Sequence, residues 1–253
     1  MKRLLLAVAV SQLSFGPARA QSDFGLWYEL GAEKKLSRQW NIGGEAELRT
    51  RNNAKTIDRW SVGLSAEYRI IKGVKASAGY TFLYDNNPEE LTFNSSGDPN
   101  KYTPRYWGAR HRFNVSLSGS TEWNRFKFSL RERWQYTYRP EVADKKYKFS
   151  YDEDDNLSAY TMQPVKGKGK HVLRSRIGIN YDIPQWKLDP FVNIEMFNDK
   201  DGIQKMRYQA GIDYKFRKKH TFALTYRFQD VNNDDDDHEV NSHLVGISYT
   251  YKF

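Results

Sequence analysis

The chain has 253 residues, with 40 Lys and Arg against 31 Asp and Glu, which gives a formal net charge of +9. It is 15% aromatic yet only 39% hydrophobic, an unusual pairing for a soluble enzyme, whose core is filled mainly by Leu, Ile and Val. The absence of Cys excludes a disulfide framework, a lipid-acylated cysteine and a thiolate metal site.

The first residues have the pattern of a secretory signal peptide. A basic start precedes an apolar run at residues 4–10, and the Ala-Arg-Ala sequence at 18–20 has the form of a cleavage site. We therefore expect residues 1–20 to be removed and residues 21–253 to form one domain. After the cleavage site no apolar run approaches the roughly 18 residues that a membrane-spanning helix needs.

Alternation of apolar and polar residues dominates the rest of the chain. In the segment 60–70 every even position is apolar or aromatic, and every odd position is polar, charged or Gly. This period of two is typical of a strand with one dry and one wet face, and a helical period fits no whole segment. Eleven segments follow the pattern, at residues 24–34, 40–51, 59–71, 74–84, 109–119, 125–139, 170–181, 188–197, 205–216, 221–229 and 243–253.

The connections between these segments fall into two classes. SRQ, IKG, STEWN, DIPQWK and RKKH are short, whereas the stretches 85–108, 140–169 and 230–242 are long, polar and charged. Short turns at one end and long loops at the other are the layout of an outer-membrane barrel whose turns face the periplasm. Trp40, Trp123 and Trp186 lie at or beside the short turns, where amphipathic rings would meet the lipid headgroups.

The main alternative is a soluble β-sandwich, whose strands also alternate. Such a fold would fill one core with branched aliphatic residues. Here Tyr and Phe recur on the dry face while Arg and Lys recur on the wet face, which favours lipid outside and water inside. We predict an all-β fold, an antiparallel transmembrane β-barrel with short periplasmic turns and long extracellular loops, located in the bacterial outer membrane.

The number of strands is the weak point of this prediction. Eleven strands would force the first and last to pair in parallel, whereas bacterial single-chain barrels normally have an even number. We therefore predict about 10 to 12 strands, on the expectation that either a strand inside a long loop has been missed or one segment has been split wrongly. Glu132 falls on the outward face of the segment 125–139, where a charge is unfavourable, and a β-bulge near 131–133 would redirect it.

Both ends of the predicted barrel resemble a known family. The final YTYKF, with aromatic residues at alternate positions, resembles the terminal strand signal that barrel-assembly machinery reads in bacterial outer-membrane proteins, which assigns that role to Tyr249, Tyr251 and Phe253. The opening DFGLWYELGAEKKLSRQWNIGGEAELR and the ending NSHLVGISYTYKF are similar to an outer-membrane barrel family catalogued as domain of unknown function 2490. The resemblance implies a barrel and supplies no catalytic residues.

Charged residues of opposite sign occupy inward positions on different strands. Paired arginines recur on three middle strands and would form a basic wall, at Arg110, Arg112, Arg131, Arg133, Arg174 and Arg176. Acids on the first three strands would form a facing acidic wall, at Glu29, Glu33, Glu45, Glu47 and Glu67. Such walls could admit small charged solutes, with a bias toward anions, through an open or gated channel. The same side chains could instead fill the interior with ion pairs and leave a sealed structural or surface-interaction barrel.

A third possibility is an outer-membrane enzyme, but the sequence offers no catalytic motif. None of the five His residues is followed two positions later by the Ser of a lipid-modifying barrel enzyme, and Asp236 with His238 lies in an acidic run that reads as a solvated loop. We therefore predict no enzymatic activity and no cofactor.

The acidic loops have alternate oxygen ligands but lack the Gly and Glu that complete a standard calcium loop. Loose divalent-ion bridging to lipopolysaccharide is a hypothesis for them, and we predict no defined metal site. The alternate oxygens are Asp152, Asp154 and Asn156 in one loop and Asp230, Asn232, Asp234 and Asp236 in the other. Nucleic acid is not expected as a partner, because aromatic and basic residues occupy opposite faces. The expected partners are outer-membrane lipid, lipopolysaccharide and the barrel-assembly machinery.

Overall fold

The computed structural model describes residues 22–152, 157–183, 185–217, 219–232 and 239–253. The predicted signal peptide lies outside these residues, as do Asp154, Asn156, Asp234, Asp236 and His238. The described ranges are built from strands and turns, and they contain no helix long and apolar enough to span a membrane.

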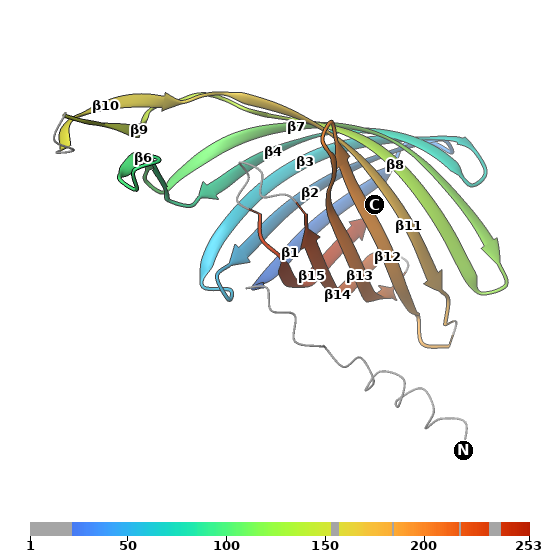
Figure 1. Cartoon of the computed structure of the whole chain (residues 1–253). Helices are drawn as coiled ribbons and strands as arrows, with labels where there is room; N and C mark the ends of the chain where they lie inside the picture. Colours follow the sequence, from blue (N-terminus) through green and yellow to red (C-terminus); the bar gives the residue numbers. More distant parts are fainter. Residues whose placement is uncertain (1–21, 153–156, 184, 218, 233–238) are drawn as a thin grey trace, which may run out of the picture.

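Eleven strands form a closed barrel (Figure 1). Each of the eleven predicted segments overlaps one barrel strand, so the predicted fold is confirmed. The barrel strands are β1 (Asp23–Lys35), β2 (Trp40–Arg51), β3 (Thr56–Ile71), β4 (Val74–Asn87), β7 (Tyr106–Trp123), β8 (Phe126–Arg139), β11 (Lys168–Tyr181), β12 (Leu188–Asp199), β13 (Gly202–Phe216), β14 (His220–Val231) and β15 (Ser242–Lys252).

The barrel closes through a parallel pair. β1 runs parallel to β15, from Asp23 beside Ser242 to Glu33 beside Lys252, while every other neighbouring pair in the barrel is antiparallel. The expectation that a strand had been missed to give an even number is therefore wrong. Two of the three long loops, 85–108 and 140–169, do contain strands, but these join a separate sheet and not the barrel wall.

The barrel has its large apolar side chains on the outside. Leu64, Ile177 and Leu224 are 69%, 63% and 59% exposed on the outer face, an arrangement that suits lipid contact and would be unfavourable in water. The inner face is mainly polar, and its buried apolar side chains are few among the described residues: Trp27, Leu83, Phe197 and Leu244.

Glu132 is the exception on the outer face. The pairing of β8 with β7 and with β11 continues without a register shift through residues 131–133, so the bulge predicted there is wrong. Glu132 lies between the outward residues Leu117 and Ser175, and its Oε2 accepts a hydrogen bond from Ser175 Oγ at 2.7 Å. The hydroxyl thus partly satisfies a carboxyl group near the middle of the outer surface.

Four further strands form a small sheet, called here the rim sheet, with the order β10-β9-β6-β5. They are β5 (Glu90–Phe93), β6 (Pro99–Thr103), β9 (Val142–Tyr151) and β10 (Leu157–Val165). The first two lie between β4 and β7 in the chain, and the other two lie between β8 and β11. Figure 1 shows them beyond the loop end of the barrel, so the rim sheet extends one part of the barrel wall.

Candidate functional site in the barrel lumen

The barrel interior holds a cavity of about 610 Å³ that every barrel strand helps to line. On β13 its lining runs from Gln204 near the loop end to Asp213 near the short-turn end. The nine residue steps between them extend on the order of 30 Å along the strand, so the cavity follows most of the length of β13. It is the natural candidate for a functional site in this fold.

The lining is strongly charged, with 15 Lys and Arg against nine Asp and Glu among the described residues. All six arginines of the predicted basic wall line the cavity, and so do Glu29, Glu45 and Glu47 of the predicted acidic wall. Glu33 and Glu67 do not: they lie near the short-turn end, where Glu33 pairs with Lys252 at 3.5 Å and Glu67 with Lys75 at 2.8 Å.

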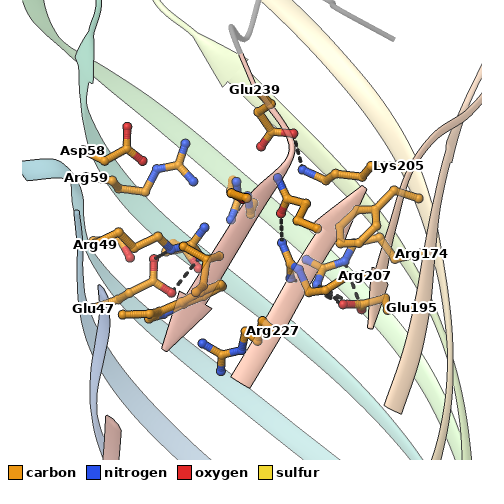
Figure 2. Close-up of a pocket in the computed structure, with 18 of the residues that line it drawn as sticks. Glu47, Arg49, Asp58, Arg59, Arg174, Glu195, Lys205, Arg207, Arg227 and Glu239 are labelled. Carbon is orange, nitrogen blue, oxygen red and sulfur yellow. Dashed lines mark hydrogen bonds and ion pairs between the residues drawn. The ribbon is translucent and has the colours of Figure 1, made fainter. Parts of the chain in front are cut away.

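The two signs are less segregated than the sequence predicts. Arg49 on β2 stands beside the acidic residue Glu47, and its Nε lies 2.6 Å from Glu47 Oε1. Glu195 on β12 lies among arginines. Figure 2 shows the Glu47–Arg49 pair and the Glu195 group on two sides of the same space. Both walls therefore carry mixed charge, with an excess of positive charge overall.

Glu195 is the centre of the largest ion-pair group. Arg131 Nη2 lies 2.5 Å from Glu195 Oε1, Arg174 Nη2 lies 3.0 Å from each carboxylate oxygen, and Arg207 Nη1 lies 3.6 Å from Oε2. The ring of Phe197 lies 4.6 Å and 4.9 Å from the guanidinium carbons of Arg174 and Arg207. One carboxylate therefore serves three guanidinium groups, and the group keeps a net positive charge.

A second group surrounds Asp85 on β4. Arg59 donates to both carboxylate oxygens of Asp85, from Nη2 at 3.0 Å and from Nε, and Arg110 Nε lies 2.8 Å from Oδ2. Asp85 is 5% exposed, so these charge-assisted hydrogen bonds compensate for the loss of water around the carboxylate. Asp85 thereby fixes one arginine of the predicted basic wall.

Three other arginines of that wall have no carboxylate partner among the described residues. Arg112 Nε donates to Thr137 Oγ1 at 3.4 Å and Arg133 Nε donates to Ser116 Oγ at 2.8 Å, while Arg176 has no side-chain hydrogen bond within the described ranges. They stand on the successive strands β7, β8 and β11. This part of the lumen therefore presents positive charge that no described carboxylate contacts directly.

A third group lies at the seam between the ends of the barrel sheet. The ring of Trp27 on β1 is 5% exposed, and the guanidinium carbons of Arg49, Arg227 and Arg207 lie 3.3, 3.9 and 5.4 Å from its centroid. Arg227 on β14 also reaches Glu29 on β1, with Nη2 and Oε1 3.4 Å apart. These contacts span β15 and connect its two neighbours.

Sequence reasoning missed several residues of these groups. All of them lie at inward positions of their strands, so the alternation of inward and outward side chains could have placed them in the lumen. They are Trp27, Asp85, Glu195, Arg207 and Arg227. The alternation does not show which of these side chains contact one another, however, because those contacts depend on the stagger of strands that are far apart in the sequence.

The described residues do not assemble a recognisable catalytic or metal centre. No group of three or more His, Cys, Asp or Glu within the described ranges could hold a metal ion. The described histidines lie on the outer face of the barrel against aromatic rings. The pairs include His111 Nδ1 with Tyr80 Oη at 2.8 Å and His243 Nδ1 with Tyr226 Oη at 2.6 Å.

Comparisons with known proteins support the fold. The chain is similar to the β domain of the Bordetella autotransporter BrkA, with a TM-score of 0.50 and 12% identity over 83% of this chain and 79% of that one. It is also similar to the NanC porin, with a TM-score of 0.45 and 14% identity over 91% of this chain and 99% of that one. Comparison with curated proteins gives no match. A family model described as "Protein of unknown function (DUF2490)" matches residues 24–240, which confirms the predicted resemblance: the chain belongs to this family.

Proposed function

We propose that this protein is a channel of the bacterial outer membrane that passes small solutes with a preference for anions. In this proposal the short turns face the periplasm and the long loops face the cell surface, as in barrels of this class. The surrounding lipid, lipopolysaccharide and the barrel-assembly machinery are its expected partners. The proposal assigns the barrel no catalytic step.

The observation that carries this proposal is the set formed by Arg112, Arg133 and Arg176, called here the partnerless set because no described carboxylate lies within ion-pair distance of its members. The strand register adds to it, because Arg133 stands directly opposite Arg174 and Arg131 directly opposite Arg176. Two like charges about 6 Å apart repel by roughly 3 kcal/mol at an effective dielectric constant of about 20. A solute anion that enters the lumen would reduce this repulsion, whereas a cation would increase it.

The ion-pair groups limit the size of the solute, because they occupy part of the lumen. Side chains from four consecutive strands meet in the Glu195 group, where Arg131 on β8 contacts Glu195 on β12, so part of the interior is filled. The remaining cavity of about 610 Å³ is of the size that holds a small molecule. A small solute is therefore favoured over a polymer or a folded protein.

The test is electrical. Full-length protein in a planar bilayer under a KCl gradient should give conductance steps with a reversal potential that indicates anion preference. Replacing the three partnerless arginines with Gln should move the reversal potential toward that of a nonselective pore. A matched control removes three positive charges outside the cavity, with Lys55→Gln, Lys72→Gln and Lys200→Gln, and should leave selectivity unchanged.

Two outcomes would contradict the proposal. Folded protein that conducts nothing would favour the sealed barrel, in which the ion pairs close the lumen. Conductance without anion preference, or selectivity that the control changes as much as the arginine variant, would show that the partnerless set does not act on the permeating ion.

A further inference from the structure

A second cavity, called here the rim cavity, lies between the rim sheet and the loop end of the barrel and has a volume of about 490 Å³. Its lining comes from both hairpins of the rim sheet and from the barrel strands that carry them. Asn87, Pro88, Arg139 and Lys168 line this cavity and the lumen alike. The rim cavity is therefore continuous with the mouth of the barrel.

The two faces of the rim sheet differ in chemistry. Lys101, Lys146 and Gln163 line the rim cavity, whereas Tyr102, Tyr147 and Tyr160 belong to the other face, with ring centroids 6.3 Å apart for the first two and 5.8 Å apart for the last two. Because β6, β9 and β10 alternate in this way, basic residues face the mouth and aromatic residues face away from it.

The rim cavity is positively charged. Five basic residues line it, Lys101, Arg139, Lys146, Lys166 and Lys168, against the single acid Glu90 among the described residues. Four of them, all but Lys168, have no carboxylate within ion-pair distance in the described ranges. The Nε of Arg139 is buried and has no hydrogen-bond partner there, so an acceptor from outside the chain would satisfy it.

The junction between the two hairpins places like charges together. Only two residue pairs of the described rim sheet join β6 to β9: Lys101 opposite Lys148, and Tyr102 opposite Tyr147. Like charges directly opposite each other destabilise a strand pair. Only one other residue pair among the described residues, Tyr102 with Tyr147, joins these two strands. An anion bound beside Lys101 would remove that repulsion and strengthen the junction.

We propose that the rim cavity is a binding site for a small anion that carries phosphate and more than one negative charge. Lys101, Lys146, Lys166 and Arg139 bind it from four separate segments, and a multivalent anion matches several converging cations better than a monovalent one does. Its occupancy joins the β5–β6 and β9–β10 hairpins at the loop end of the barrel. Delivery of the anion onward to the lumen rests on the proposed channel function, whereas binding does not.

Pyrophosphate is the probe for this site. Calorimetric titration of the full-length protein in detergent should show one binding event, and the triple variant Lys101→Gln, Lys146→Gln and Lys166→Gln should weaken it by about 100-fold or more, since each lost charge-assisted hydrogen bond weakens binding severalfold. The control is the Lys55→Gln, Lys72→Gln and Lys200→Gln variant, which should bind as the unchanged protein does. Hydrogen exchange at the amides of Tyr102 and Tyr147 should slow when pyrophosphate is bound.

A competition experiment between lipopolysaccharide and pyrophosphate distinguishes a lipid headgroup from a free solute as the source of the phosphate. Lipopolysaccharide that displaces pyrophosphate would support the site and identify a lipid headgroup as its ligand, whereas lipopolysaccharide without effect would support a free solute. Absence of binding, or equal affinity in the rim variant and the unchanged protein, would overturn the inference. The variant that lacks Arg112, Arg133 and Arg176 separates the two proposals, because it should lose anion selectivity and still bind pyrophosphate at the rim.

Discussion

Trp27→Leu should destabilise the barrel more than any substitution of a Trp on its outer surface. Trp27 lies at the parallel β1–β15 seam, where Arg49 and Arg227 hold their guanidinium carbons 3.3 and 3.9 Å from its ring centroid. Across β15, Gly246 leaves room for this arrangement, because a Cβ atom there would lie 3.0 Å from Arg227 Nη1. Leu would keep part of the apolar contact but remove the ring that both cations share.

The expected loss follows from these contacts. A desolvated cation–π contact contributes on the order of 1–2 kcal/mol, and Trp27 makes two close ones while only 5% exposed. Removing the ring also leaves the guanidinium groups of Arg49 and Arg227 without the aromatic face that lies between them, so their mutual repulsion would destabilise the barrel. Since Leu retains some buried surface, we expect the free energy of unfolding to fall by about 2–4 kcal/mol, below the cost of complete truncation.

Urea unfolding in phospholipid vesicles, followed by circular dichroism, would measure this change. The matched control is Trp123→Leu, because Trp123 is 66% exposed at the short-turn end, and it should shift the midpoint only slightly. A double-mutant cycle with Arg227→Met should give a coupling of about 1–2 kcal/mol. Equal midpoints for the two Trp variants, or no coupling to Arg227, would refute the role of Trp27 in holding the seam.

Three other substitutions test the lumen, the outer face and the packing of the wall. Glu195→Gln removes the carboxylate that three arginines share and should lower the free energy of unfolding by about 3–5 kcal/mol; an unchanged urea midpoint would contradict this geometry. Glu132→Leu should raise the stability by about 1–2 kcal/mol, because a carboxyl group faces lipid there, and a lower midpoint would show that the hydrogen bond from Ser175 outweighs that cost. Gly178→Ala should lower the midpoint, since the new Cβ would lie 2.1 Å from Asn193 Oδ1, and adding Asn193→Ala should restore part of the loss.

The barrel could be predicted because its information is local. Residues 60–70 alternate without a break, and a strand with one dry face needs no knowledge of its neighbours to be recognised. The number of strands followed from the same count. The assumption of an even total then led to the wrong expectation of a twelfth or a wrongly split strand. The parallel β1–β15 pair depends on how the first and last strands lie against each other, and neither strand has a sequence pattern that indicates it.

The ion-pair groups could not be predicted in the same way. Arg131 and Glu195 are 64 residues apart in the chain, and their contact depends on the stagger of β8 and β12 relative to β11, which lies between them. The rim sheet was hidden for another reason: β5 and β6 have only four and five residues, and lysines in 142–151 gave that stretch the composition of a polar loop. Alternation in KYKFSY at 146–151 was the available signal.

The position of these groups around the ring suggests a division of roles within the lumen. The Trp27 group lies on β1, β2 and β14, around the seam, and its charges are matched by Glu29 and Glu47. Parallel pairing is slightly less stable than antiparallel pairing. The side-chain contacts in the lumen between β14 and β1 therefore stabilise the wall where β1 and β15 pair in parallel.

The partnerless arginines lie on β7, β8 and β11, which are on the far side of the eleven-strand ring from β1. There the wall is antiparallel throughout and needs no such reinforcement, so its charges can remain unneutralised. The same wall carries the rim sheet, whose basic face continues the line of positive charge beyond the barrel mouth. One side of the lumen thus stabilises the closure of the barrel, and the other side, with its extension, is the surface that both proposals assign to an anion.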